Sequence, residues 1–127
     1  MDQSVPANVC AVALIATADR PSLLNRRSLP SVFEQNLPPA HVVVVDDSRE
    51  VDNTHAVREV CSRWRDRGVP LHYLENRRTL GAAGAWNTGL DHLARNVGDP
   101  TQTYVCILDD DDAWMPSHLA ECIGYAI

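Results

Sequence analysis

A run of four aspartates, at positions 109–112, is the part of this sequence whose residue types most directly suggest chemistry. Two unit charges about 4 Å apart repel each other by about 4 kcal/mol at an effective dielectric constant near 20, so the run needs a counter-charge. No lysine or arginine lies within ten residues of it on either side. Mg²⁺ and Mn²⁺ prefer carboxylate oxygens and often share them with substrate phosphates, so the run predicts a divalent-cation site. The alternative interpretation is an acidic surface turn that caps a helix.

Two further segments have both a chemical and a structural interpretation. The first, Asp46-Asp47-Ser48, is typical of a turn closed by an aspartate side chain, and Asp47 could equally accept a hydrogen bond from a nucleotide base or ribose. The second, Gly81-Ala-Ala-Gly84, resembles a phosphate-binding turn but matches neither G-x-G-x-x-G nor an ending in Gly-Lys-Ser. Close packing of a helix explains it as well. Arg77 and Arg78 lie just before it and could reach a diphosphate.

Four apolar runs precede or separate these polar segments, and we expect them to be buried strands. They cover residues 9–16, 41–45, 71–74 and 104–108. Helical spacing of apolar residues predicts helices at 23–33 with an interruption at Pro30, at 54–67 ended by Gly68, from the 81–84 segment to about 97, and from Pro116 onward. The alternation of strand and helix predicts an α/β fold, a Rossmann-like parallel sheet flanked by helices, in a single domain of residues 1–127.

The polar segments fall where the predicted strands end. Thr17 follows the first strand, Asp46 and Asp47 follow the second, and Asp109 follows the fourth. Ligands of open parallel sheets bind at the carboxyl ends of the strands, where the strand order reverses. With the order 3-2-1-4 and strands about 4.8 Å apart, Asp47 and Asp109 would lie about 10 Å apart across the first strand. That span suits a nucleoside.

Composition excludes some classes of protein and restricts others. The chain of 127 residues carries a net charge of −6, with no basic patch of the kind that nucleic-acid binding requires. Its four cysteines form no C-x-x-C pair and are expected to be reduced, and no signal-peptide pattern opens the chain. We therefore expect a cytoplasmic protein. The five histidines show no metal-ligand spacing, so none is assigned to a metal.

Four segments, in this order, resemble the first half of the family 2 glycosyltransferases, which have the GT-A fold. They are VALIATADRP, HVVVVDDS, GAAGAWNTGL and ILDDDDAWMPSHL, and the resemblance runs from about residue 9 to the end of the chain. It implies the nucleotide-sugar-binding part of a glycosyltransferase. The donor would be a nucleoside-diphosphate sugar, and the cofactor Mn²⁺ or Mg²⁺.

The resemblance also implies roles for individual residues. Asp109 and Asp111 would form an Asp-x-Asp motif that holds the metal against the diphosphate, and Asp110 would lie near the ribose. Thr17 and Asp47 would contact the nucleotide base, and Gly81 and Asn87 would lie on the diphosphate side. The full set of other nucleotide-sugar-binding positions is Thr17, Asp19, Arg20, Asp46, Asp47, Arg78, Gly81 and Asn87.

The family's reaction is inverting, with an acceptor hydroxyl that a base deprotonates. We expect the base, and the site for an acceptor of unidentified class (glycan, lipid or small molecule), in a second half that follows residue 127. An exposed apolar flank, open to that half or to a second copy of the chain, is expected with it. One alternative, nucleotidyl transfer, usually has a glycine-rich basic loop after the first strand, where this chain has TADRPSLL. The other, a receiver-like signalling module that binds Mg²⁺, needs a lysine, and this chain has none.

Overall fold

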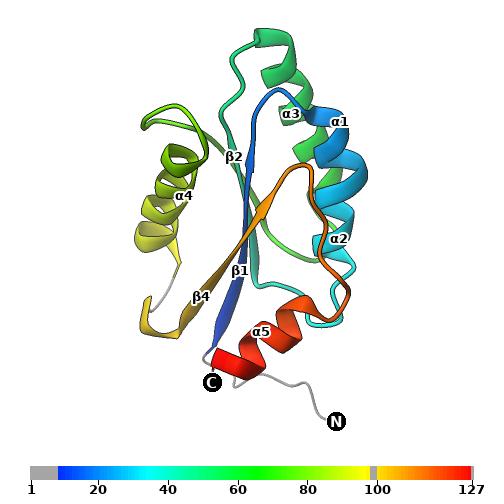
Figure 1. Ribbon diagram of the computed structural model, residues 1–127, viewed down its shortest axis with the longest axis vertical. Helices are drawn as coiled ribbons and strands as arrows, with labels where there is room; N and C mark the ends of the chain where they lie inside the picture. Colours follow the sequence, from blue (N-terminus) through cyan, green and yellow to red (C-terminus); the bar gives the residue numbers. More distant parts are fainter. Residues whose placement is uncertain (1–8, 98–99, 127) are drawn as a thin grey trace.

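The computed structural model describes residues 9–97 and 100–126, which form a four-stranded parallel sheet with helices on both faces (Figure 1). The order β3-β2-β1-β4 and the parallel pairing of every neighbouring pair confirm the predicted topology. Each strand extends to or slightly beyond the end of its predicted apolar run. The strands are β1 (Cys10–Thr17), β2 (His41–Asp46), β3 (Leu71–Glu75) and β4 (Thr103–Asp109).

The helices divide between the two faces of the sheet, and each face has its own apolar core. In Figure 1, α4 (Ala82–Asn96) lies on one side, and α1 (Pro21–Leu23), α2 (Leu29–Phe33), α3 (Val51–Trp64) and α5 (His118–Ala126) lie on the other. Alternate strand residues point to opposite faces. Leu14 and Val45 therefore pack toward α4, whereas Ile15 and Val44 pack toward α2 and α3. β1 and β2 are buried on both faces, as their continuous apolar runs predict.

The first helical segment is interrupted, as Pro30 predicts, but the irregularity precedes the proline. A π-helical stretch, η1 (Leu24–Ser28), separates α1 from α2, and the Leu29 N–H donates to the Leu24 carbonyl. Proline has no N–H to donate and its ring clashes with the carbonyl of residue i−4 in a regular helix. The wider turn just before Pro30 relieves this conflict without ending the helical path.

The largest differences from the predicted bounds lie at α3 and α5. The sequence predicts a helix over 54–67 that ends at Gly68, whereas α3 begins and ends three residues earlier. Arg65 is already extended, and the turn after it places Asp66 as well as Gly68 at positive φ. The last helix begins at His118 instead of Pro116, because residues 116–117 form a turn.

The sheet has two edge strands with different surroundings. β4 is one edge, and its Ile107 is 45% exposed. β3 is the other edge. No helix in the described ranges, 9–97 and 100–126, is long and apolar enough to span a membrane. The four cysteines are free thiols; a cytoplasmic location stays a prediction.

Candidate functional site

A pocket of about 410 Å³ opens at the carboxyl ends of β1, β2 and β4, where the strand order reverses. We call it the acidic pocket. Most of the side chains that the sequence assigns to a nucleotide-sugar site line it, together with neighbouring small residues. Its lining consists of Ala16, Thr17, Ala18, Asp19, Arg20, Asp47, Arg49, Gly81, Ala82, Ala85, Asp109, Asp110 and Asp111. The tertiary structure thus brings the ends of three strands and the start of α4 to one site.

The alternation of strand residues decides which aspartate faces which way. Asp109 follows the same face as Ile107, toward α4, and is exposed. Asp110 follows Leu108 toward the face covered by α1 to α3, and its side chain is only 8% exposed. The acidic run therefore presents one carboxylate to solvent in the pocket and buries the next.

Asp110 is, with Asp47, one of two buried aspartates that line the pocket. Its Oδ2 accepts hydrogen bonds from Thr17 Oγ1 (2.9 Å) and from the Ala18 N–H (3.3 Å), which ties the end of β4 to the end of β1. Burial raises the pKa of the Asp110 carboxyl, and these two donors, with the positive charge of Arg20, act in the opposite direction. The Asp110 carboxylate is therefore shielded from water but keeps hydrogen-bond donors from the protein.

Arg20 supplies the counter-charge that the sequence neighbourhood of the acidic run lacks. Its Nη1 lies 3.4 Å from Asp110 Oδ1 and 3.1 Å from Asp111 Oδ2. The run therefore does have a salt-bridge partner, which comes from the loop after β1, about ninety positions away in sequence, and not from its own sequence neighbourhood. The arginine side chain is 51% exposed, so solvent screens these pairs, and each is worth about 0–1 kcal/mol.

Asp47 holds together the two loops that frame the pocket on the side of α4. Its Oδ2 accepts from the Gly81 N–H (2.7 Å), and its Oδ1 accepts from Asn76 Nδ2 (2.9 Å). Asn76 was not among the predicted site residues. Its position one residue after β3 was the signal available in the sequence, since that is where parallel sheets present ligand-binding side chains.

Asp19 lines the pocket but directs its carboxylate to the loop after β2. It accepts hydrogen bonds from the N–H groups of Arg49 and Glu50 and from Asn53 Nδ2. These donors lower the pKa of Asp19, the Glu50 N–H most of all. Carboxylates are favourable near the N-terminus of a helix, here α3, because its N–H groups are unsatisfied. Asp19 therefore fixes one wall of the pocket.

Three predicted site residues do not line the acidic pocket, which corrects their predicted location. Asp46 points to the opposite face of β2 from Asp47, where it accepts from Tyr73 Oη (2.6 Å) and from the Ser48 N–H (2.9 Å), the latter closing the predicted turn. Arg78 turns away to pair with Asp91 on α4. Asn87 is exposed on α4. Asp47, next to Asp46, lines the pocket, whereas these three side chains do not.

The glycine segment is explained by packing. A Cβ at Gly84 would lie 1.7 Å from the Thr79 carbonyl oxygen, so only glycine allows the loop before α4 to lie against the helix. Gly81 has a φ of +105°, which L side chains rarely adopt, and its N–H is taken by Asp47. The segment shapes the pocket by letting the backbone approach closely.

The acidic pocket supplies some of the carboxylate ligands that a divalent cation needs, but not a full set of protein ligands. Asp109 and Asp111 both line it, and carboxylate oxygens suit Mg²⁺ and Mn²⁺. Within the described part of the chain, no three His, Cys, Asp or Glu side chains converge as a metal-holding group. This fits an ion that is bound through one or two carboxylates and completed by substrate phosphates, as is common for Mg²⁺.

Comparison with known proteins places this geometry in context. A family model described as glycosyl transferase family 2 matches residues 14–127. Galactofuranosyltransferase GlfT1 from Mycolicibacterium smegmatis is 36% identical over 118 residues, which cover 90% of this chain and 34% of that protein. Succinoglycan biosynthesis protein ExoW from Rhizobium meliloti is 34% identical over 94 residues, 74% of this chain and 27% of its own length.

A solved structure shares the arrangement as well. The mannosyltransferase PcManGT from Pyrobaculum calidifontis, in complex with GDP-Man and Mn²⁺, superposes with a TM-score of 0.66 at 26% identity. The match covers 89% of this chain and 31% of that one. The chain therefore spans about a third or less of the length of each of these proteins.

Proposed function

The chain belongs to glycosyl transferase family 2, and from this premise we propose that its acidic pocket binds a nucleoside-diphosphate sugar together with Mn²⁺ or Mg²⁺. One observation carries the proposal: Asp47, which follows β2, and Asp109 and Asp111, at the end of β4, line one pocket at the reversal of strand order. The structural relative in complex with GDP-Man and Mn²⁺ supports the same ligand class. The donor sugar, the base and the acceptor are not assigned.

The walls formed by Thr17 and Asp47 are suited to the nucleoside. Asp47 accepts two hydrogen bonds from the protein, and an ionised carboxylate has about four lone-pair sites, so it retains acceptor capacity for a base or ribose. Thr17 donates its hydroxyl proton to Asp110 and keeps its lone pairs free to accept. Because their positions are fixed by the protein's own bonds, these groups lose little freedom on binding.

The diphosphate belongs on the side of the acidic run. Asp109 and Asp111 would hold the cation, which when bound would neutralise charge that develops on the departing nucleoside diphosphate. Arg20 would exchange its contact with Asp111 for the phosphate oxygens, since guanidinium pairs readily with both groups. Asp110 would stay in its buried position and keep the end of β4 against β1.

Transfer itself requires a group that accepts the proton of the acceptor hydroxyl. We assign no residue of this chain to that role. We propose inverting transfer, with an acceptor site completed by residues other than those that line the acidic pocket. The donor half of the reaction is testable by itself.

The test is calorimetry with GDP and UDP in the presence and absence of Mn²⁺. We expect binding that requires the metal and that Asp111→Ala weakens by about a hundredfold or more, since loss of a direct charged ligand costs about 3 kcal/mol. Asp52→Ala is the matched control, because Asp52 is an exposed aspartate of α3 outside the acidic pocket. Equal affinity with and without Mn²⁺, or equal losses in both variants, would contradict the proposal.

A further inference from the structure

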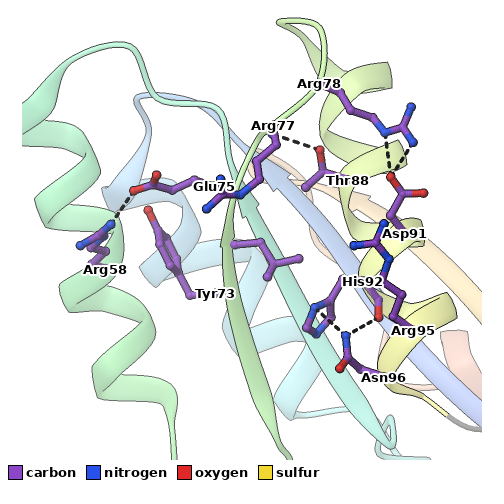
Figure 2. A pocket seen from close by; sticks show the side chains of 11 residues that line it. Arg58, Tyr73, Glu75, Arg77, Arg78, Thr88, Asp91, His92, Arg95 and Asn96 are labelled. Carbon is purple, nitrogen blue, oxygen red and sulfur yellow. Dashed lines mark hydrogen bonds and ion pairs between the residues drawn. The ribbon is translucent and has the colours of Figure 1, made fainter.

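A second cleft, of about 650 Å³, lies beside the edge strand β3, between α3 and α4 (Figure 2). We call it the arginine cleft. None of its lining residues lines the acidic pocket, so the two are separate sites. Its volume falls in the range of about 300–1,000 Å³ that small-molecule sites occupy. It is not used by the proposed binding of the donor.

The cleft is locally basic on an acidic protein. It is lined by four arginines, Arg58, Arg77, Arg78 and Arg95, and by two acidic residues, Glu75 and Asp91. Four positive charges against two negative ones leave an excess of two, whereas the whole chain carries −6. Such a concentration of arginine is not a consequence of composition and favours an anionic ligand.

The two carboxylates of the cleft are already paired. Arg58 binds Glu75 from the side of α3, and Arg78 binds Asp91 through both Nε (2.8 Å) and Nη2 (2.5 Å). Figure 2 shows these pairs on opposite sides of the cleft. Within each pair the two charges offset each other, and the two pairs hold the side chains on the two sides of the cleft.

The remaining two arginines carry the unneutralised charge. Within the part of the chain that the structure describes, neither the Arg77 nor the Arg95 guanidinium has a hydrogen-bond or ion-pair partner. The Arg77 backbone is held by its N–H bond to Thr88 Oγ1 (3.3 Å), so the free side chain extends from an anchored point. Arg95 projects from the last turn of α4.

We propose that the arginine cleft binds a phosphate group, through Arg77 and Arg95. A phosphate monoester carries a charge of about −1.5 to −2 at neutral pH, which matches two free guanidiniums, and the planar donor fork of arginine fits phosphate oxygens in pairs. The phosphate could belong to a soluble phosphorylated molecule or to a lipid headgroup. The chemistry is the same for both sources, and the experiment separates them.

The first experiment is titration of the protein with inorganic phosphate at constant ionic strength, without divalent metal. Without a cation the carboxylates of the acidic pocket repel phosphate, so binding there is suppressed. We expect Arg77→Gln/Arg95→Gln to weaken phosphate binding by about tenfold or more, which is about 1.4 kcal/mol. Arg77→Lys/Arg95→Lys keeps the charge but not the fork and should recover part of the affinity.

The matched control is Arg63→Gln/Arg65→Gln, which removes the same charge from exposed residues of α3 and the turn after it, outside the cleft. An affinity within about twofold of the original chain is expected for it. Equal losses in the two double variants, or no measurable phosphate binding to the original chain, would overturn the proposal. Circular dichroism of each variant establishes that it is folded.

The second experiment identifies the source of the phosphate. Vesicles of phosphatidylcholine with phosphatidic acid, compared with phosphatidylcholine alone, report lipid phosphate, and binding that depends on Arg77 and Arg95 assigns the site to a headgroup. Phosphate binding without vesicle binding assigns it to a soluble molecule. Metal-dependent binding of nucleoside diphosphate should persist in Arg77→Gln/Arg95→Gln, so failure of this inference is distinguishable from failure of the proposed function.

Discussion

Thr17 at the end of β1 donates a hydrogen bond of 2.9 Å to Asp110, the residue that follows β4. The two residues are 93 positions apart in sequence and both are buried. The bond joins the two strands between which the order of the sheet reverses. It therefore fixes the floor of the acidic pocket independently of any ligand.

Replacing Thr17 with valine should destabilise the fold by about 2 kcal/mol, because a buried charged acceptor loses a donor. The measurement is urea unfolding at neutral pH. Thr17→Ser keeps the hydroxyl and should lose much less. A Thr17→Val variant that is as stable as the original chain, or that loses less than Thr17→Ser does, would show that the methyl group matters and the hydrogen bond does not.

Replacing Arg20 with glutamine should increase the affinity for Mn²⁺ alone. Arg20 lies 3.1 Å from Asp111 and offsets its charge, and an exposed pair of this kind is worth about 0.2–1 kcal/mol, or about 1.4-fold to fivefold in affinity. Electron paramagnetic resonance of free Mn²⁺ measures this without a nucleotide. Arg26→Gln, outside the acidic pocket, should leave the affinity unchanged. Weaker binding by the Arg20 variant would show that the arginine supports the metal site instead of competing for it.

Gly84→Ala should destabilise the protein by about 1–3 kcal/mol or more, because the added methyl group would overlap the Thr79 carbonyl oxygen. Thermal or urea unfolding measures the change. Gly124→Ala makes the same substitution in α5, where a Cβ meets nothing within 4 Å, and should gain up to about 1 kcal/mol from helix propensity. A neutral Gly84 variant would mean that the loop before α4 yields easily.

Stability should fall through His72 as the pH falls below about 6.5, the ordinary pKa of histidine. His72 Nε2 lies 3.1 Å from His41 Nδ1, and its Nδ1 lies 3.3 Å from His92 Nε2. Burial, then the neighbouring charges of His92 and His41, lower the pKa of His72 below its ordinary value of 6.5. The unfolded chain therefore binds a proton at a higher pH than the folded chain does, and the contribution present above pH 6.5 is lost as the pH falls toward the lowered value.

His72→Gln should flatten this pH dependence of the free energy of unfolding, measured by urea titration at several pH values. His55→Gln, at an exposed position of α3, is the control and should retain it. If the His72 variant keeps the slope of the original chain, the histidines do not couple folding to protonation.

The sequence by itself determined the sheet and the composition of the site. Continuous apolar runs specify strands buried on both faces, and polar residues after three of them specify which end of the sheet carries the chemistry. Those patterns are local, because a strand that is buried on both faces is apolar at consecutive residues. The parallel order and the gathering of Asp47 and Asp109 in one pocket followed from them.

Only the tertiary structure decided how each polar side chain is used. Arg20 neutralises an acidic run 90 positions away, and Arg78 joins a second cleft instead of the pocket that its neighbour Gly81 lines. The adjacent side chains of Asp46 and Asp47 point to opposite faces of β2 and bind different partners. Charge partners and side-chain directions depend on distances across the folded chain, and a sequence window contains no such distances.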